Sequence, residues 1–263
     1  MEGLESFLDR IICGDALEVM SQLPSGSIDV VVTSPPYNLR ETTGGMRHDS
    51  YSSGKRWRSM QINHGYDTYA DKLPYPEYVA WQRACLTEML RLVPDTGAVF
   101  YNHKWRIQGG LLQDRHDILD GFPVRQIIIW QRAGGINFND YYFVPTYEVI
   151  YLIAKPKFRL LPTRNKLGDI WYFPQETHNP HPAPFPVGIP YNILTSVPFE
   201  VCLDPFMGSG TTAVVAQHLG KHYIGIDVSP AYVQMAEERL VRNRDLDEVA
   251  YYALYSAQRR GKG

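Results

Sequence analysis

Six consecutive residues, Thr33-Ser34-Pro35-Pro36-Tyr37-Asn38, combine groups that could hold a planar ring bearing an amino group. They follow an apolar, β-branched run at residues 28–32, which is typical of a buried strand. The two prolines cannot continue a strand ladder, and they fix a stiff, extended corner after it. Open α/β sheets bind ligands at such carboxyl strand ends, so this corner is a candidate catalytic site.

The chemistry that this corner suits is transfer of a group to an exocyclic amine. The Ser34 hydroxyl and the Pro35 carbonyl could accept the two amino hydrogens, while the Tyr37 ring stacks on the base. In cytosine or adenine the amino lone pair is delocalised into the ring, and acceptors that draw the hydrogens out of plane would return it to nitrogen. Attack on a sulfonium methyl would then need only position and electrostatics. The same residues could instead form a proline-rich turn with a packed tyrosine.

A second turn, in the last third of the chain, has the residue pattern of a nucleoside-binding site. A short apolar strand at 201–203 leads into the run Asp204–Ala213, DPFMGSGTTA, and a helix is predicted at 214–219. The two glycines let the backbone turn tightly beside a ligand, and the helix presents free N–H groups and a partial positive end. Within this run we assign to the ligand site Asp204, Phe206, Gly208, Gly210 and Thr211.

An acid at the end of the next strand completes the nucleoside-binding pattern. The strand predicted at 222–226 ends in Asp227, which could bind ribose hydroxyls. A dinucleotide enzyme shares this pattern, but the Asp204 carboxylate would repel a pyrophosphate and attract an ammonium group. The chain also offers no second domain for a hydride acceptor, and no lysine follows Gly210 as a P-loop requires. The ligand that fits is S-adenosylmethionine, which has a nucleoside, a cationic sulfur and a zwitterion.

Together the two turns resemble those of the DNA amino-methyltransferases, which carry (Asp/Asn/Ser)-Pro-Pro-(Tyr/Phe) and Asp-x-Phe-x-Gly-x-Gly motifs. Here the Ser-Pro-Pro-Tyr corner comes first, and a His-Pro segment at 181–186 lies between the two turns. This order resembles the β group of the family, and the resemblance covers nearly the whole chain. It implies that the catalytic residues are Ser34, Pro35, Pro36 and Tyr37.

Three further residues are assigned to the cofactor site. Thr33 ends the strand that carries the catalytic corner. Phe185 belongs to the His-Pro segment, which in the resembled family forms a wall of the cofactor pocket, although a rigid linker is the alternative. Asp15 either caps the helix predicted at 16–23 or, as the resemblance implies, lies near the adenine of the cofactor.

The resemblance implies a site-specific DNA methyltransferase that acts on a base flipped out of the duplex. In the family, serine at the first motif position mostly accompanies N4-cytosine, so cytosine N4 is the expected target, with adenine N6 as the alternative. An RNA amino-methyltransferase is a more distant alternative. The expected partners are double-stranded DNA and a second copy of the chain, and the resemblance leaves room for a cognate restriction endonuclease. No metal ligand spacing is present, and no metal is expected.

The element pattern predicts one doubly wound α/β domain over residues 1–263, with a mostly parallel sheet and the Rossmann-like methyltransferase fold. Its catalytic half is 1–154, with a flexible loop at 39–74, and its cofactor half is 175–263. Residues 155–174 are a small target-recognition insert or a surface hairpin. Further strands are expected at 8–13, 98–101, 124–130 and 146–154. Further helices are expected at 75–92, 104–119 and 230–240.

Composition sets the class of partner and compartment. The chain has 263 residues, 44% hydrophobic content and a net charge of -2, so any DNA-binding basic face must be segregated. The loop at 39–74 holds cations and aromatic residues that suit phosphate contact and stacking, or it is a solvated linker. The three cysteines are far apart in apolar surroundings, which favours core positions in a reducing, cytoplasmic compartment. No apolar run is long enough to span a membrane.

Overall fold

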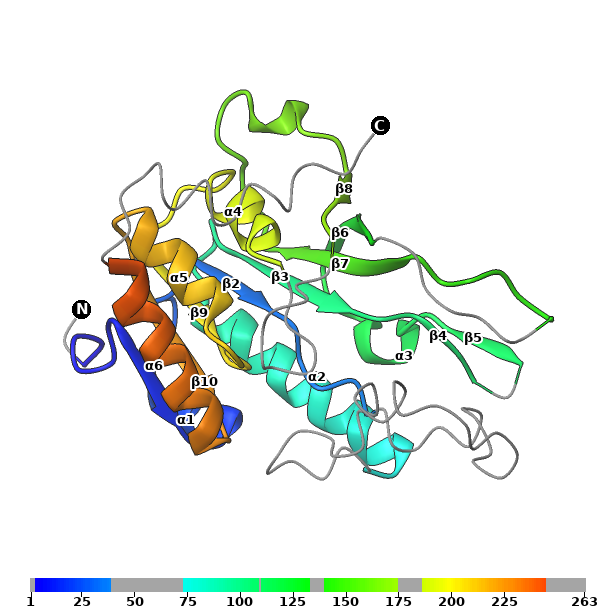
Figure 1. Cartoon of the computed structure of the whole chain (residues 1–263), viewed down its shortest axis with the longest axis horizontal. Coiled ribbons are helices and arrows are strands. Elements are labelled where there is room, and N and C mark those ends of the chain that lie inside the picture. Colours follow the sequence, from blue (N-terminus) through cyan, green and yellow to red (C-terminus); the bar gives the residue numbers. More distant parts are fainter. Residues whose placement is uncertain (1–2, 39–72, 109, 133–139, 175–185, 245–263) are drawn as a thin grey trace, which may run out of the picture.

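The computed structural model describes residues 3–38, 73–108, 110–132, 140–174 and 186–244, and they form a sheet with helices on both faces (Figure 1). The strands of the main sheet are β1 (Arg10–Cys13), β2 (Val30–Thr33), β3 (Ala98–His103), β6 (Val124–Gln131), β7 (Tyr147–Ala154), β8 (Ile170–Tyr172), β9 (Val201–Asp204) and β10 (His222–Asp227). A separate hairpin pairs β4 (Arg106–Gln108) with β5 (Leu111–Gln113). The helices are α1 (Ala16–Gln22), α2 (Tyr75–Leu92), α3 (His116–Leu119), α4 (Gly188–Leu194), α5 (Thr211–His218) and α6 (Pro230–Arg244), with a short 3-10 helix, η3 (Arg164–Lys166).

The strand order brings the two predicted turns together. The main sheet of the described chain runs β1-β10-β9-β2-β3-β7-β6-β8. The pairs from β1 to β3 are all parallel, and β7 runs antiparallel to both of its neighbours. In the centre, β2 lies beside β9, with Val30 opposite Cys202 and Val31 opposite Leu203. The predicted doubly wound, mostly parallel sheet is therefore confirmed, and its catalytic and cofactor strands are direct neighbours.

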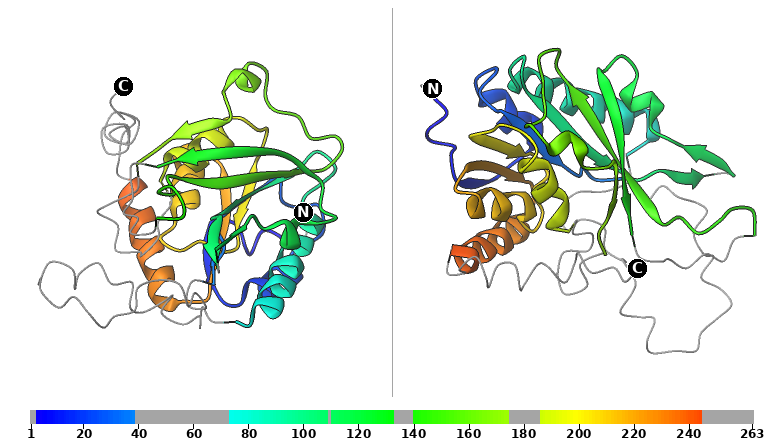
Figure 2. Two further views of the ribbon diagram at one scale, coloured as in Figure 1. Left: turned by 90° about the vertical axis from the view of Figure 1, so that its right-hand side faces the viewer. Right: turned by 90° about the horizontal axis from the view of Figure 1, so that it is seen from above.

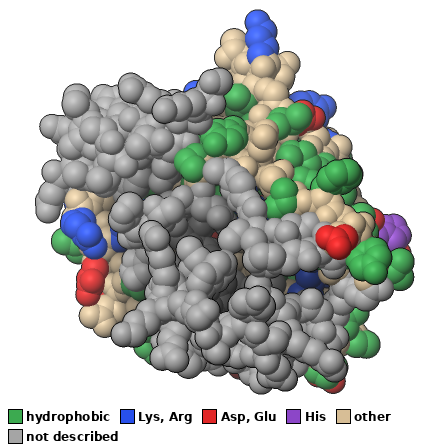
Figure 3. Space-filling view, turned by 45° about the vertical axis from the view of Figure 1, so that its right-hand side comes forward, with side chains coloured by type: hydrophobic (Ala, Val, Ile, Leu, Met, Phe, Trp, Pro, Cys, Tyr) green, Lys and Arg blue, Asp and Glu red, His purple; other side chains and the backbone are tan. Residues whose placement is uncertain are grey.

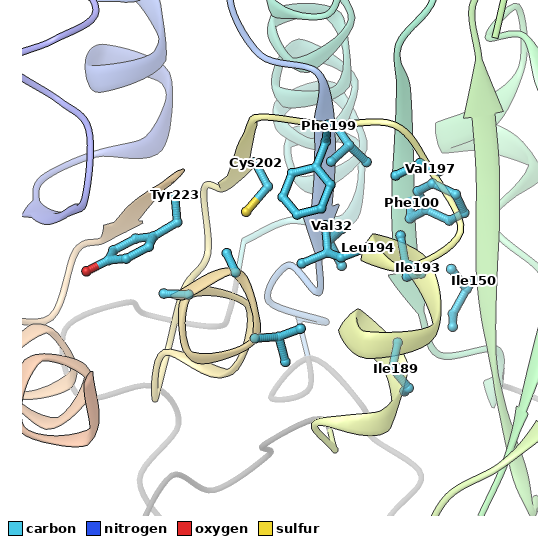
Figure 4. Close-up of a cluster of buried hydrophobic side chains, with 14 of the residues drawn as sticks. Val32, Phe100, Ile150, Ile189, Ile193, Leu194, Val197, Phe199, Cys202 and Tyr223 are labelled. Carbon is cyan, nitrogen blue, oxygen red and sulfur yellow. The ribbon is translucent and has the colours of Figure 1, made fainter. Parts of the chain in front are cut away.

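Alternating strand residues build a core on each face of the sheet. Val31 and Val99 pack with residues of α1, α2 and α3. Val32 and Phe100 point the other way, toward α4 and α5, as Figure 4 shows for Val32, Phe100 and the α4 residues Ile193 and Leu194. The two further views in Figure 2 show the same three layers, with the sheet between the two sets of helices. Between these layers the carboxyl ends of the neighbouring central strands β2 and β9 lie side by side.

The helix predicted at 104–119 is wrong. The structure has the β4–β5 hairpin there, followed by the four-residue helix α3. Gly110 (φ +80°) and Arg115 (φ +69°) lie in the left-handed region, which interrupts a helix. The apolar residues Leu111 and Leu112 of this segment are 70% and 55% exposed, so they belong to a surface hairpin.

The surface at that end of the molecule carries several apolar side chains. Besides Leu111 and Leu112, Tyr141 and Phe143 before β7 are almost fully exposed. Figure 1 shows the hairpin and the chain leading into β7 reaching out on the same side, and Figure 3 shows hydrophobic side chains gathered over part of the described surface.

None of the described helices is long and apolar enough to cross a membrane.

The prediction that the cysteines lie in the core is confirmed for two of the three. Cys85 and Cys202 are buried, but Cys13 is exposed, because it is the last residue of β1 at the edge of the sheet. All three are free thiols.

The segment 155–174 is partly a sheet element. Its last residues form β8, which pairs in parallel with β6 at the sheet edge. Its cations Lys155 and Lys157 bind Val93 O and Asp95, whereas Arg164 and Lys166 are exposed on η3, which stands away from the sheet (Figure 1). A recognition role for this segment stays a prediction, and η3 is the part that would carry it.

Candidate active site

Thr33 and Asp204 join the catalytic corner to the glycine turn. Thr33 Oγ1 donates to Asp204 Oδ1 at 2.7 Å, across the ends of β2 and β9. Asp204 Oδ1 also accepts from Phe206 N at 3.1 Å, and Oδ2 accepts from Thr212 Oγ1 at 2.8 Å. The carboxylate is only 1% exposed, and burial raises its pKa to about 6 despite these hydrogen bonds. Asp204 is thus a brace between the two turns, and its predicted contact with a cofactor ammonium group stays a prediction.

Ser34 and Tyr37 face each other within the catalytic corner. Ser34 is partly buried, and its Oγ lies 2.7 Å from Tyr37 OH. The Tyr37 ring is 7% exposed and stacks on His103, with centroids 4.8 Å apart. The tyrosine therefore contributes structure to the corner, and its predicted stacking on a target base stays a prediction.

A polar network that the sequence reading did not identify supports this pair. Tyr37 OH donates to Glu148 Oε2 at 3.1 Å. Asn102 Nδ2 lies 2.7 Å from Tyr37 OH and 3.1 Å from both Ser34 Oγ and Glu148 Oε2. Arg132 pairs with Glu148 Oε1 at 3.2 Å. The sequence does hold a signal for Glu148, since it is the one charged residue in the apolar run that forms β7.

The Pro36 carbonyl is held from α2. Gln82 Nε2 donates to Pro36 O at 3.1 Å, and Tyr78 OH lies 3.0 Å from the same oxygen and 2.7 Å from His103 Nε2. Burial lowers the pKa of His103 well below its ordinary value, so the ring is neutral. Its Nδ1 contacts Lys104 O, which leaves Nε2 to accept from Tyr78 and makes Gln82 the donor to Pro36.

These contacts leave hydrogen-bond acceptors at the corner. Pro35 is buried, and within the described ranges no hydrogen bond engages its carbonyl. Ser34 Oγ contacts Tyr37 and Asn102, which does not exhaust its lone pairs. Ser34 and Pro35 therefore retain the acceptor capacity that the sequence predicts for binding an amino group.

The glycine turn is held by the carboxylate of Asp227. Gly208 N donates to Asp227 Oδ2 at 2.8 Å, and Ser229 N donates to Oδ1 at 2.9 Å. Burial raises the pKa of Asp227. The carboxylate is partly exposed at the end of β10, and each oxygen retains a lone pair for a ligand hydroxyl.

Gly210 is required by packing as well as by its backbone conformation. Its φ is +81°, and a Cβ atom there would lie 2.9 Å from Ala236 Cβ in α6. Arg239 of α6 donates to Ser209 O at 3.2 Å and to Thr211 Oγ1 at 2.9 Å. The predicted ligand residues Gly210 and Thr211 therefore also fix α5 against α6.

The remaining predicted cofactor residues lie around the same edge. Asp15 caps α1, since its Oδ1 accepts from Leu17 N at 2.8 Å and Glu18 N at 3.1 Å, so the capping interpretation is confirmed. Its side chain is exposed next to the end of β10, where Gly14 N donates to Asp227 O.

Phe206 is partly buried and packs edge-on against Trp81 of α2. Phe185 and the loop at 39–72 lie outside the described residues.

A doubly wound sheet whose central strands end in a Ser-Pro-Pro-Tyr corner and an adjoining glycine turn defines a Rossmann-like methyltransferase. A family model of the N6 and N4 methyltransferases, described as DNA methylase, matches residues 28–238. The chain belongs to this family, as its two motifs predict. This confirms the amino-methyltransferase class and leaves the target base open.

Curated relatives and solved structures agree with this assignment. The type II methyltransferase M.BglII of Bacillus subtilis is 28% identical to this chain, and the match covers 89% of this chain and 69% of M.BglII. M.HinfI of Haemophilus influenzae is 27% identical, and the match covers 91% of this chain and 70% of M.HinfI. A protein of Thermus thermophilus, assigned as a DNA modification methylase and solved with S-adenosyl-L-methionine, has a TM-score of 0.61 at 25% identity. The match covers 89% of this chain and 93% of the Thermus chain. The cytosine-N4-specific PvuII DNA methyltransferase has a TM-score of 0.67 at 18% identity, covering 96% and 93%, and supports the fold.

Proposed function

We propose that this protein transfers a methyl group from S-adenosylmethionine to the exocyclic amino group of a base in duplex DNA, with cytosine N4 as the target. The observation that carries this proposal is the hydrogen bond between Thr33 and Asp204. It places the acceptors of the catalytic corner and the glycine turn at adjacent strand ends, so a methyl donor and an amino group can share one site. Membership of the DNA methylase family supports the same reaction.

The residues of the glycine turn fit the proposed cofactor. Asp227 offers carboxylate lone pairs at the end of β10, as ribose hydroxyls require. Asp15, exposed beside it, would lie near the adenine, and Phe206 would form an apolar wall. When bound, S-adenosylmethionine supplies an electrophilic methyl group on a cationic sulfur. The chain supplies position, and the α2 contacts to Pro36 keep the corner rigid.

At the catalytic corner, Ser34 Oγ and Pro35 O accept the two amino hydrogens of the target base. This removes the amino lone pair from ring delocalisation and directs it at the methyl group. A paired base cannot present that nitrogen, so the target is flipped out of the duplex. The Tyr37 ring, backed by His103, lies beside the base.

Serine at the first motif position supports cytosine, because it is a weaker proton acceptor than aspartate. The test is to incubate the purified protein with unmethylated duplex DNA and the cofactor, digest the DNA, and quantify N4-methylcytosine and N6-methyladenine. We expect N4-methylcytosine at one sequence context, found by sequencing. Only N6-methyladenine would overturn the choice of base, and methylation of RNA in place of DNA would overturn the substrate class.

Partners and compartment follow from this function. We propose that η3, with Arg164 and Lys166 exposed, contacts the DNA, and that the protein acts in the cytoplasm, in keeping with its three free thiols. A homodimer and a cognate restriction endonuclease complete the proposal. Light scattering of the purified protein tests the first, and cleavage of unmethylated but not methylated DNA by a neighbouring gene product tests the second.

A further inference from the structure

The carboxylate of Glu148 reaches the catalytic corner from the start of β7. Its Oε1 pairs with Arg132 Nη1 at 3.2 Å, and the side chains of Glu148 and Arg132 are only 8% and 11% exposed. Its Oε2 lies 3.1 Å from both Tyr37 OH and Asn102 Nδ2. As the partner of an arginine, this carboxylate accepts hydrogen bonds and donates none.

This acceptor sets the direction of the hydrogen bonds that lead to Ser34. Tyr37 has one hydroxyl hydrogen, and Glu148 Oε2 receives it. The 2.7 Å contact between Ser34 Oγ and Tyr37 OH must therefore be donated by Ser34. The Ser34 oxygen then has only lone pairs left, one facing Asn102 Nδ2 at 3.1 Å and one for a further donor.

We propose that Glu148 is a positioning residue that, through Tyr37, makes Ser34 an obligate acceptor for the amino group of the target base. This inference rests on the proposed function and adds a basis for base discrimination. A base with a carbonyl at the same ring position, uracil or hypoxanthine, would place an oxygen against the Ser34 lone pairs. The site would thus reject such a base, because neither Ser34 Oγ nor the carbonyl oxygen of the base has a hydrogen to donate to the other.

The same hydrogen bonds give the released proton a path. The nitrogen–methyl bond forms as the methyl–sulfur bond breaks, so the sulfur becomes a neutral thioether and the amino nitrogen becomes positive. One amino proton then moves to Ser34 Oγ, the Ser34 hydroxyl proton moves to Tyr37, and the Tyr37 proton moves to Glu148. The methylated amine is neutral, both hydroxyls are restored, and the proton resides on the carboxylate.

The test compares Glu148→Gln with the wild-type protein on an unmethylated duplex that carries the sequence the wild-type protein methylates. A glutamine has nearly the same shape but can donate to Tyr37, which frees Ser34 to turn its own hydrogen outward. We expect kcat to fall about 100-fold, with cofactor affinity within about threefold of wild type. Binding is also measured to a duplex with uracil replacing the target cytosine, or hypoxanthine replacing a target adenine. Wild type should prefer the amino base by about 100-fold, and Glu148→Gln should lose most of that preference.

Glu88→Gln is the matched control, since Glu88 also pairs with an arginine, Arg91, but on α2 away from the corner. It should keep both kcat and the preference. Tyr37→Phe interrupts the same path while keeping the ring stacked on His103, and it tests the inference even if Glu148→Gln fails to fold. It should show the same losses. When Glu148→Gln folds, the double variant should be no worse than Tyr37→Phe alone.

The inference would be overturned if the wild-type protein is active and Glu148→Gln keeps both the wild-type kcat and the preference for the amino base. So would additive losses in the double variant. Absence of methyl transfer by the wild-type protein to any nucleic acid would instead overturn the proposed function itself.

Discussion

Thr33 and Asp204, 171 positions apart in the sequence, share a hydrogen bond of 2.7 Å between Thr33 Oγ1 and Asp204 Oδ1. The bond links the last residues of two neighbouring parallel strands. It places the catalytic corner and the glycine turn at one edge of the sheet. Because the Asp204 carboxyl group is buried, its contribution to the stability of the fold depends measurably on pH.

Asp204→Asn should change how stability depends on pH. Burial raises the Asp204 pKa from 3.8 to about 6, so this carboxyl binds more protons folded than unfolded. Its contribution to stability is fully present below about pH 4 and is lost as pH rises through about 6. Relative to Asp204→Asn, wild type should therefore lose on the order of 2 kcal/mol between pH 4.5 and 7.5, measured by urea unfolding. A difference that is constant with pH, or that grows in the opposite direction, would contradict this assignment.

Ser34→Ala should abolish most of the methyl transfer while leaving cofactor binding intact. The variant loses the acceptor for the target amino group, and we expect kcat to fall at least about 100-fold. Transfer of a labelled methyl group to DNA measures kcat, and calorimetry measures the cofactor Kd. Ser27→Ala is the control, because Ser27 precedes the other end of the same strand and donates to Pro24 O. Loss of cofactor affinity in Ser34→Ala would contradict the division between the two turns.

Asp227→Asn should weaken cofactor binding by about 10- to 100-fold, because a carboxylate acceptor for the ribose is lost. The matched control is Asp29→Asn. Asp29 also accepts two backbone N–H groups, from Glu200 at 2.8 Å and Val201 at 2.9 Å, but at the amino ends of β2 and β9. Both variants should lose similar stability in a thermal melt, and only Asp227→Asn should lose cofactor affinity. Equal affinities in the two variants would refute the ribose assignment.

Gly210→Ala should destabilise the fold more than Gly121→Ala does. Both glycines have φ of +81°, so both alanines carry the strain of the left-handed conformation. Only at Gly210 would the new Cβ meet Ala236, whereas Gly121 has no heavy atom within 4 Å. The difference in free energy of unfolding isolates the packing of α5 against α6, and we expect about 1–3 kcal/mol. Equal losses would show that packing at Gly210 is relaxed.

Local sequence patterns predicted most of the regular elements. The 3.6-residue apolar spacing gave α2 at 75–92 with the bounds that the structure has, because its buried face is continuous. The strands predicted at 28–32, 146–154 and 222–226 correspond to β2, β7 and β10 within one or two residues. The helix predicted at 104–119 is wrong because Gly110 and Arg115 lie in the left-handed region and the apolar residues Leu111 and Leu112 face no core.

The sequence by itself determined the chemistry of the two turns, since Ser34-Pro35-Pro36-Tyr37 and the run from Asp204 to Ala213 each depend on residues that are adjacent in the chain. Only the tertiary structure decided what surrounds them. Asn102 contacts Ser34, and Glu148, which pairs with Arg132, contacts Tyr37, although the three residues come from separate strand ends. Pairing of distant segments also made Asp204 a buried brace. Contacts over more than 100 residues follow from sheet order and burial, which no local spacing specifies.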